Sequence, residues 1–189
     1  MTNSVYAFLK ALQNAPVIAA VKSDEDLSKA LDSECTVIFF LYGTLLNIAS
    51  LVQTAKDGNK LALVHVDLIE GLSGRDIAVD FLASNTKADG IISTRPNLIH
   101  RAKERGLIAV QRFFLLDSIA YDNVLKQSSH ADAVDVLPGA MPRVLARLSK
   151  QLHQPLIASG LLADKQDIIS ALSAGAIAVS TTSEALWDI

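Results

Sequence analysis

Eight short apolar segments recur along the chain, and each is followed by a segment with the pattern of a helix. The apolar segments lie at residues 17–21, 36–41, 61–66, 89–92, 107–110, 133–136, 155–158 and 175–182. Strands that are apolar throughout, rather than at every second residue, indicate a parallel sheet covered on both faces. Since 189 residues are shared among eight units, each unit has about two dozen residues, which favours a closed barrel over an open doubly wound sheet. We therefore predict a compact TIM-type (β/α)8 barrel of parallel strands.

An extra helix is expected before the first strand, at residues 4–14. Its apolar side is predicted to consist of Tyr6, Phe8, Leu9 and Leu12. In the helix expected at residues 73–85, the side chains predicted to point inward are Ile77, Phe81 and Leu82. Because no linker or low-complexity run interrupts the pattern, we expect a single barrel domain over residues 1–189.

Composition excludes some classes of protein. The net charge of -3 argues against a globally basic nucleic-acid binder but leaves room for a local basic patch. The single cysteine, Cys35, is expected to be a small core residue, and with no internal disulfide the default location is the cytoplasm. The uncharged stretch at residues 35–55 contains a polar stripe at helical spacing, so we read it as a buried strand followed by an amphipathic helix and predict no membrane span.

The last two strands end in small residues that are suited to holding phosphate. The seventh ends at Ser159 and Gly160, and the eighth ends at Ser180 and Thr181. Glycine lets a ligand approach the main chain, hydroxyls add hydrogen-bond donors, and each following helix is expected to turn its N-terminal amides to the same place. In eight-stranded α/β barrels phosphate is usually held in the loops after these two strands, so these four residues are the predicted phosphate site.

The other strand ends carry charged residues that could complete such a site. Lys22 and Arg112 can neutralise an anion, while Asp67 and Glu70 can accept hydrogen bonds from ligand hydroxyls. His65 is interpreted as a packed, hydrogen-bonded core histidine, and because no other His or Cys has suitable spacing we predict no metal. From these residues alone, a sensor of a phosphate ester and an isomerase- or aldolase-type enzyme using Lys22 or Asp67 remain equally plausible.

Four segments favour the sensor, because together they resemble one known family. They are Val64–Leu72, Lys87–Thr94, Gln111–Ser118 and Gly175–Thr182. Over nearly its whole length the chain resembles the bacterial glycerol-3-phosphate-responsive antiterminator family. The resemblance implies a non-enzymatic regulator that has no cofactor, takes glycerol 3-phosphate as its effector and binds the leader messenger RNA of glycerol-metabolism genes.

Two basic clusters are the candidate RNA-binding surfaces. One consists of Arg143, Arg147 and Lys150 at helical spacing, and the other of Arg101, Lys103 and Arg105. Phosphate contacts would supply most of the affinity of such a surface. No aromatic stacking platform for bases is visible in the sequence. A homodimer that joins two basic faces is one expected means of coupling effector to RNA.

Overall fold

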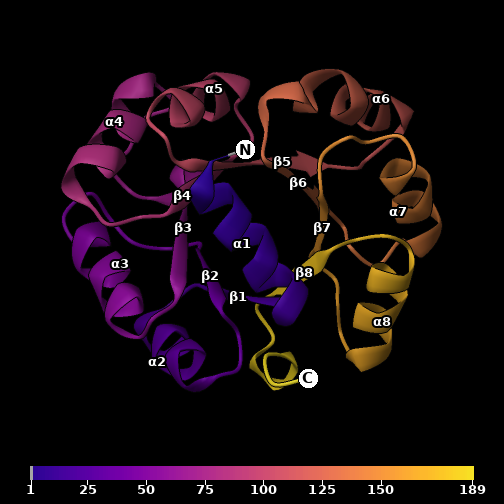
Figure 1. Cartoon of the computed structure of the whole chain (residues 1–189), viewed down its shortest axis with the longest axis horizontal. Helices are drawn as coiled ribbons and strands as arrows, with labels where there is room; N and C mark the ends of the chain where they lie inside the picture. Colours follow the sequence, from indigo (N-terminus) through magenta and orange to yellow (C-terminus); the bar gives the residue numbers. More distant parts are fainter. Residues whose placement is uncertain (1) are drawn as a thin grey trace.

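The computed structural model describes residues 2–189, and its centre is a closed barrel of eight parallel strands (Figure 1). The strands are β1 (Val17–Val21), β2 (Val37–Phe40), β3 (Leu61–His65), β4 (Gly90–Ser93), β5 (Ile108–Phe114), β6 (Ala133–Leu137), β7 (Leu156–Ser159) and β8 (Ala178–Thr181). Each strand pairs with its neighbours in the sequence, and β8 closes the barrel against β1. The predicted TIM-type (β/α)8 fold is therefore confirmed.

A ring of helices covers the outside of the barrel (Figure 1). The α-helices are α1 (Asn3–Asn14), α2 (Asp24–Asp32), α3 (Ile48–Asp57), α4 (Asp76–Asn85), α5 (Pro96–Glu104), α6 (Ser118–Gln127), α7 (Pro142–Ser149) and α8 (Lys165–Ser173). Three short 3-10 helices are η1 (Val66–Leu68), η2 (Ser128–His130) and η3 (Glu184–Leu186). No helix within residues 2–189 combines the length and the apolar character needed to cross a membrane.

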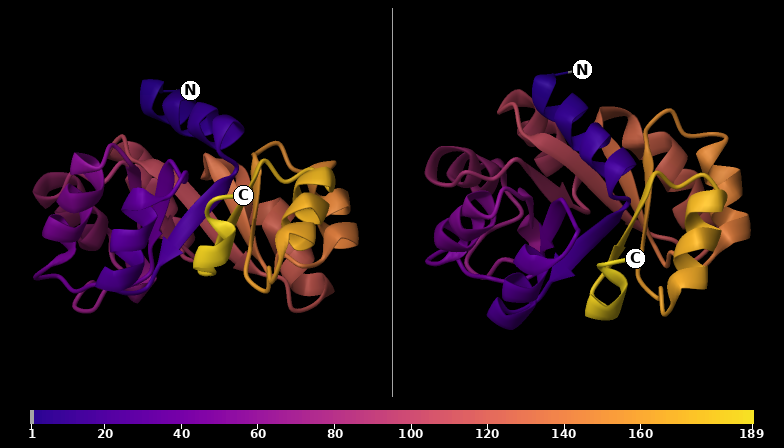
Figure 2. Two further views of the ribbon diagram at one scale, coloured as in Figure 1. Left: turned by 90° about the horizontal axis from the view of Figure 1, so that it is seen from below. Right: turned by 60° about the horizontal axis from the view of Figure 1, so that its bottom comes forward.

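The apolar residues form two cores because successive strand residues point to opposite faces. In β1, Val17, Ala19 and Val21 face outward into the layer beneath the helices, while Ile18 and Ala20 face the barrel interior. The helix α1 lies across the N-terminal end of the barrel (Figure 2) and closes the interior core. The opposite end, where the strands finish, is left for polar side chains.

Helix α1 closes the barrel with Phe8, Leu9 and Leu12 of the predicted face, but not with Tyr6. Val5, Phe8 and Leu12 are the buried residues, whereas Tyr6 is 62% exposed. The same kind of correction applies to α4, because Ile77 is 66% exposed while Leu82 is buried. In each helix one residue predicted to be buried is exposed, because its side chain lies beyond the edge of the apolar stripe that the packing covers.

Strand β5 is longer than the sequence pattern indicated. It was predicted to end at Val110 but continues to Phe114, so Gln111 and Arg112 lie inside the strand. The reason is the neighbouring strand, since Arg112 pairs in register with Asp135 of β6. This extension carries a cation into the mouth of the barrel.

Candidate functional site

A small cavity opens at the C-terminal mouth of the barrel, among the ends of β5, β6, β7 and β8. Its volume is about 200 Å³. The residues that line it are Ala20, Leu41, Arg112, Leu137, Ser159, Gly160, Leu161, Leu162, Ser180, Thr181, Thr182 and Ser183. It therefore brings together all four residues of the predicted phosphate site and one of the predicted charges, Arg112.

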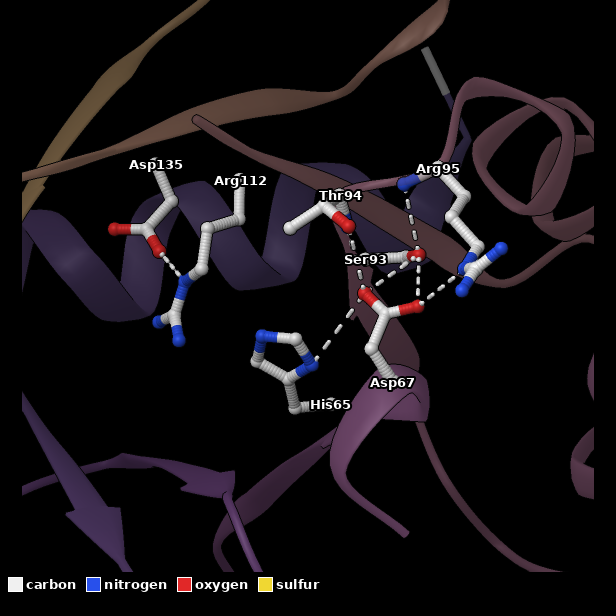
Figure 3. Close-up of polar contacts among 7 residues, drawn as sticks. All are labelled: His65, Asp67, Ser93, Thr94, Arg95, Arg112 and Asp135. Atoms are coloured by element: carbon white, nitrogen blue, oxygen red, sulfur yellow. Dashed lines mark hydrogen bonds and ion pairs between the residues drawn. The ribbon is translucent and has the colours of Figure 1, made fainter. Parts of the chain in front are cut away.

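Arg112 supplies the positive charge of the cavity and is fixed by a buried carboxylate (Figure 3). Its Nε donates a hydrogen bond of 2.5 Å to Asp135 Oδ2. Asp135 is fully buried, and its other oxygen accepts a hydrogen bond from the hydroxyl of Ser159. Within residues 2–189 the terminal nitrogens of Arg112 form no hydrogen bond, so they remain available to an anion.

The hydroxyls of Ser159, Ser180 and Thr181 differ in what they can offer. That of Ser159 is committed to Asp135, so Ser159 orients the ion pair instead of donating to a ligand. The hydroxyl oxygen of Thr181, Oγ1, accepts the Ser183 N–H at 3.1 Å, and the hydroxyl hydrogen of Thr181 remains free to donate. Ser180 forms no side-chain hydrogen bond within the described chain and is 3% exposed. The cavity thus offers two hydroxyl donors beside one oriented guanidinium.

Gly160 shapes the wall of the cavity. Its backbone φ is +75°, a left-handed conformation that residues with a Cβ rarely adopt. A Cβ added there would lie 3.1 Å from Leu137 Cδ2. Its carbonyl also accepts the N–H of Gly139 at 2.9 Å, which joins the loops after β6 and β7.

Of the two helices that follow β7 and β8, only η3 begins at this cavity, since its N-cap residue Ser183 lines it. The first turn of α8 is capped by Asp164, whose side chain accepts the N–H of Asp167. No residue of α8 lines the cavity. After β8 there is only the 3-10 helix η3, which is too short for a substantial dipole. Positive potential in the cavity therefore comes from Arg112.

Asp67 lies across the mouth, where its carboxylate is occupied by the end of β4 and the residues that follow it (Figure 3). Ser93 Oγ donates to it at 3.0 Å, the Thr94 N–H at 2.8 Å and Arg95 Nε at 3.3 Å. It does not line the cavity. These contacts tie β3 to β4, and they saturate the oxygens that were predicted to receive ligand hydroxyls.

Glu70 and Lys22 also lie outside the cavity. The main chain of Glu70 bonds to Gly43 and Leu45 and so joins the loops after β2 and β3. Lys22 is exposed at the end of β1, and its N–H donates to Asp26. The structure thus separates the eight predicted ligand residues into five that line one cavity and three that do not.

His65 faces the barrel interior between Asp67 and Arg112 (Figure 3). It is buried, but the prediction of a hydrogen-bonded histidine is wrong for its Nδ1, which has no partner within residues 2–189. The nearest acceptor, Asp67 Oδ2, is 3.8 Å away, which is too long for a hydrogen bond. Burial, and then the nearby Arg112, lower the pKa of His65 to about 4, so the ring is neutral at pH 7.

Asp135 is the functional residue that sequence reasoning missed. The available signal was a carboxylate inside the apolar strand Ala133–Val136, because a buried charge requires a partner. No group of three or more His, Cys, Asp or Glu side chains in residues 2–189 is arranged to hold a metal ion. What the cavity can do chemically is bind a small dianion with an oriented guanidinium, two hydroxyls and a glycine main chain.

The two basic clusters differ in how far they are neutralised. Arg101 pairs with Asp80 at 2.9 Å and with Glu104 at 2.7 Å, and Lys103 pairs with Asp132. Arg105 lies 3.5 Å from Asp80. On and just after α7, by contrast, the exposed residues Arg143, Arg147 and Lys150 form no ion pair within the described residues. The α7 cluster therefore keeps its charge for a partner.

A cavity lined by hydroxyls, a glycine and one arginine at the ends of β7 and β8 of a closed (β/α)8 barrel places the chain among (β/α)8-barrel proteins with a polar site at the C-terminal mouth. The chain matches the glycerol-3-phosphate responsive antiterminator family over residues 17–187, and it belongs to that family.

Known proteins resemble the chain over most of its length. It is 42% identical to the uncharacterized protein YgcP of Escherichia coli (strain K12) over 183 residues, which cover 96% of each chain. The crystal structure of the glycerol uptake operon antiterminator regulatory protein of Listeria monocytogenes has a TM-score of 0.89 and 36% identity, with 92% of this chain and 95% of that one covered. A glycerol uptake operon antiterminator-related protein of Thermotoga maritima has a TM-score of 0.81 and 34% identity, with 90% and 96% covered.

More distant structures share the fold alone. The deoxyribose phosphate aldolase of Aeropyrum pernix has a TM-score of 0.67 but 16% identity, with 98% of this chain and 95% of that one covered.

Proposed function

We propose that this protein senses glycerol 3-phosphate in the cavity at the barrel mouth. The observation that carries the proposal is the Arg112 guanidinium, which Asp135 holds with its terminal nitrogens free beside Ser180, Thr181 and Gly160. Two oxygens of a phosphate monoester can accept the parallel N–H bonds that such a guanidinium donates. The cavity volume of about 200 Å³ suits a small ester.

Calorimetry tests the sensor. Glycerol 3-phosphate should bind, and glycerol should not, because the phosphate supplies most of the binding energy. Arg112→Met should abolish binding. The matched control is Arg95→Met, which removes an arginine from the same mouth but outside the cavity. Equal affinity for glycerol and glycerol 3-phosphate, or full binding by Arg112→Met, would refute the proposal.

The output we propose is antitermination of transcription through binding of leader messenger RNA from glycerol-metabolism genes. Family membership supports antitermination, and the unpaired charges of Arg143, Arg147 and Lys150 support an RNA surface. This role belongs in the cytoplasm. An effector that acts on this output must bind the RNA-competent state more tightly than the other state. Leader RNA should therefore bind about 5- to 150-fold more tightly when glycerol 3-phosphate is present, which is the range of typical allosteric coupling. Filter binding with and without the ester measures this, and equal RNA affinities would disprove the coupling.

The alternative function, an aldolase or isomerase of phosphate esters, has less support. A Schiff-base aldolase requires a lysine at the reacting carbon, and no lysine lines the cavity in the described chain. Asp67, the candidate base, already accepts several hydrogen bonds. Turnover of a panel of phosphate esters that is lost in Lys22→Ala would reverse this conclusion.

A further inference from the structure

A second and larger hollow lies outside the barrel mouth, between α6 and α7, which are neighbours in the ring of helices (Figure 1). Its volume is about 520 Å³, against about 200 Å³ for the effector cavity. The residues that shape it include Leu115, Leu116, Tyr121, Met141, Arg147 and Gln151. We call it the α6–α7 groove.

The groove combines an apolar floor with an aromatic ring. Tyr121 is half-buried, and its hydroxyl accepts a hydrogen bond of 3.0 Å from Gln151 Nε2, which fixes the ring. The Arg147 guanidinium carbon lies 5.0 Å from the centre of that ring. Aromatic rings and arginine guanidinium planes are the surfaces on which unpaired nucleobases stack, so the packed pair of Tyr121 and Arg147 offers a stacking platform for a base. The sequence did not reveal this platform, because Tyr121 and Arg147 are 26 positions apart (147 − 121) and meet only through helix packing.

Charge around the groove is divided between its two sides. On the α7 side are Arg143, Arg147 and Lys150, which form no ion pair within the described chain and can hold phosphates. On the α6 side are two exposed carboxylates, Asp117, which caps α6 by accepting the Ala120 N–H, and Asp122; both repel phosphate, and Asp122 can accept hydrogen bonds from the amino groups of bases. A nucleotide bound here would meet this division with its base in the groove and its phosphate over α7.

We propose that the α6–α7 groove binds an unpaired nucleobase of the RNA, stacked on Tyr121, with the adjoining phosphates on α7. The proposal rests on the proposed RNA-binding function and adds to it a defined site for one base. A nucleobase is favoured over other flat apolar ligands because the Tyr121 ring on α6 packs beside the free cations of the neighbouring α7, with the Arg147 guanidinium carbon 5.0 Å from the ring centre.

The groove is also connected to the effector cavity through β5. Arg112 lines the cavity, and three residues later Leu115 lines the groove. The Leu115 N–H donates a hydrogen bond of 2.7 Å to the carbonyl of Leu137, which is itself part of the cavity wall. A ligand that pulls on Arg112 therefore acts on the backbone that forms one side of the groove.

Substitutions of Tyr121 test the site by fluorescence anisotropy with labelled leader RNA and with short homopolymers of each base, all at saturating glycerol 3-phosphate. Tyr121→Leu keeps apolar bulk but removes the stacking ring, so it should weaken RNA binding about 5- to 150-fold. Tyr121→Phe keeps the ring and should bind within about twofold of the native protein. Tyr6→Leu, at the opposite end of the barrel, is the matched control and should change nothing.

The outcomes separate the groove from the function on which it rests. If the native protein binds no RNA, both proposals fail. If the native protein binds leader RNA and Tyr121→Leu binds it equally well, only the groove is refuted. The exposed apolar residues Phe114, Leu116 and Ile119 beside the groove would also suit a second copy of the chain. A change in sedimentation mass for Tyr121→Leu with RNA affinity unaltered would assign the groove to that dimer and overturn the nucleobase site.

Discussion

Replacing Asp135 by leucine should destabilise the fold strongly, because it would leave the guanidinium of Arg112 buried without a counter-charge. Arg112 is 6% exposed and Asp135 is fully buried. Removal of one partner of such a pair costs about 3–5 kcal/mol. The Ser159 hydroxyl would lose its acceptor as well, and an unsatisfied buried hydroxyl adds about 1–3 kcal/mol.

The fully apolar replacement should behave differently. In the triple variant Arg112→Met, Asp135→Leu and Ser159→Ala no unpaired polar group remains, and exchange of a buried ion pair for apolar residues is often neutral or stabilising by about 1–4 kcal/mol. We therefore expect the triple variant to recover most of the stability that Asp135→Leu loses. It should nevertheless fail to bind glycerol 3-phosphate, because the cation that meets the phosphate is gone.

Urea unfolding with a comparison of m-values measures the stabilities, and calorimetry measures ligand binding. A loss below about 1 kcal/mol for Asp135→Leu would mean that the ion pair is weaker than its burial implies. A triple variant as unstable as the single one would mean that the pair is required for folding. Either result would refute the reasoning that this network is kept for binding.

Three further predictions concern groups outside this network. Because the pKa of His65 is lowered from 6.5 to about 4, protonation favours the unfolded state. The stabilisation of the folded state by the neutral His65 ring is therefore complete above about pH 6.5 and is lost toward pH 4, by roughly 3 kcal/mol at most. The urea midpoint of His65→Gln should lack this dependence on pH. Burial raises the pKa of the Cys35 thiol to about 11, so iodoacetamide should modify it only in urea, and rapid labelling of the native protein would contradict this. Arg143→Ala should weaken leader-RNA binding and reduce its salt dependence. Because Arg101 is already paired with Asp80 and Glu104, Arg101→Ala should lower Tm and leave RNA affinity in filter binding unchanged.

The sequence could predict the fold and part of the site because both follow from local pattern. Eight apolar strands separated by helices, in units of about two dozen residues, favour a closed barrel, and the C-terminal ends of its parallel strands meet at one end. This rule brought Arg112, Gly160 and Ser180 together correctly. It treated every strand end alike, however, so it could not separate Lys22 and Asp67 from the residues that line the cavity.

The remaining features depend on register and on the direction of side chains. Asp135 becomes the partner of Arg112 only because β5 continues beside β6 and places the two directly opposite each other. Asp67 turns toward β4 because the 3-10 helix η1 follows β3. Neither the extension of a strand nor a single helical turn has a periodic signature that a sequence reveals.

The segment after Arg112 has the energy needed to couple the two sites. Leu115 is buried and bonded to Leu137, while its neighbour Leu116 is 85% exposed beside the groove. Coupling by a factor of about 5 to 150 requires about 1–3 kcal/mol, and full burial of one leucine side chain supplies about 1.5–3 kcal/mol. A ligand that draws on Arg112 and so buries the exposed side chain of Leu116 against the groove wall would therefore provide the coupling without any rearrangement of the barrel.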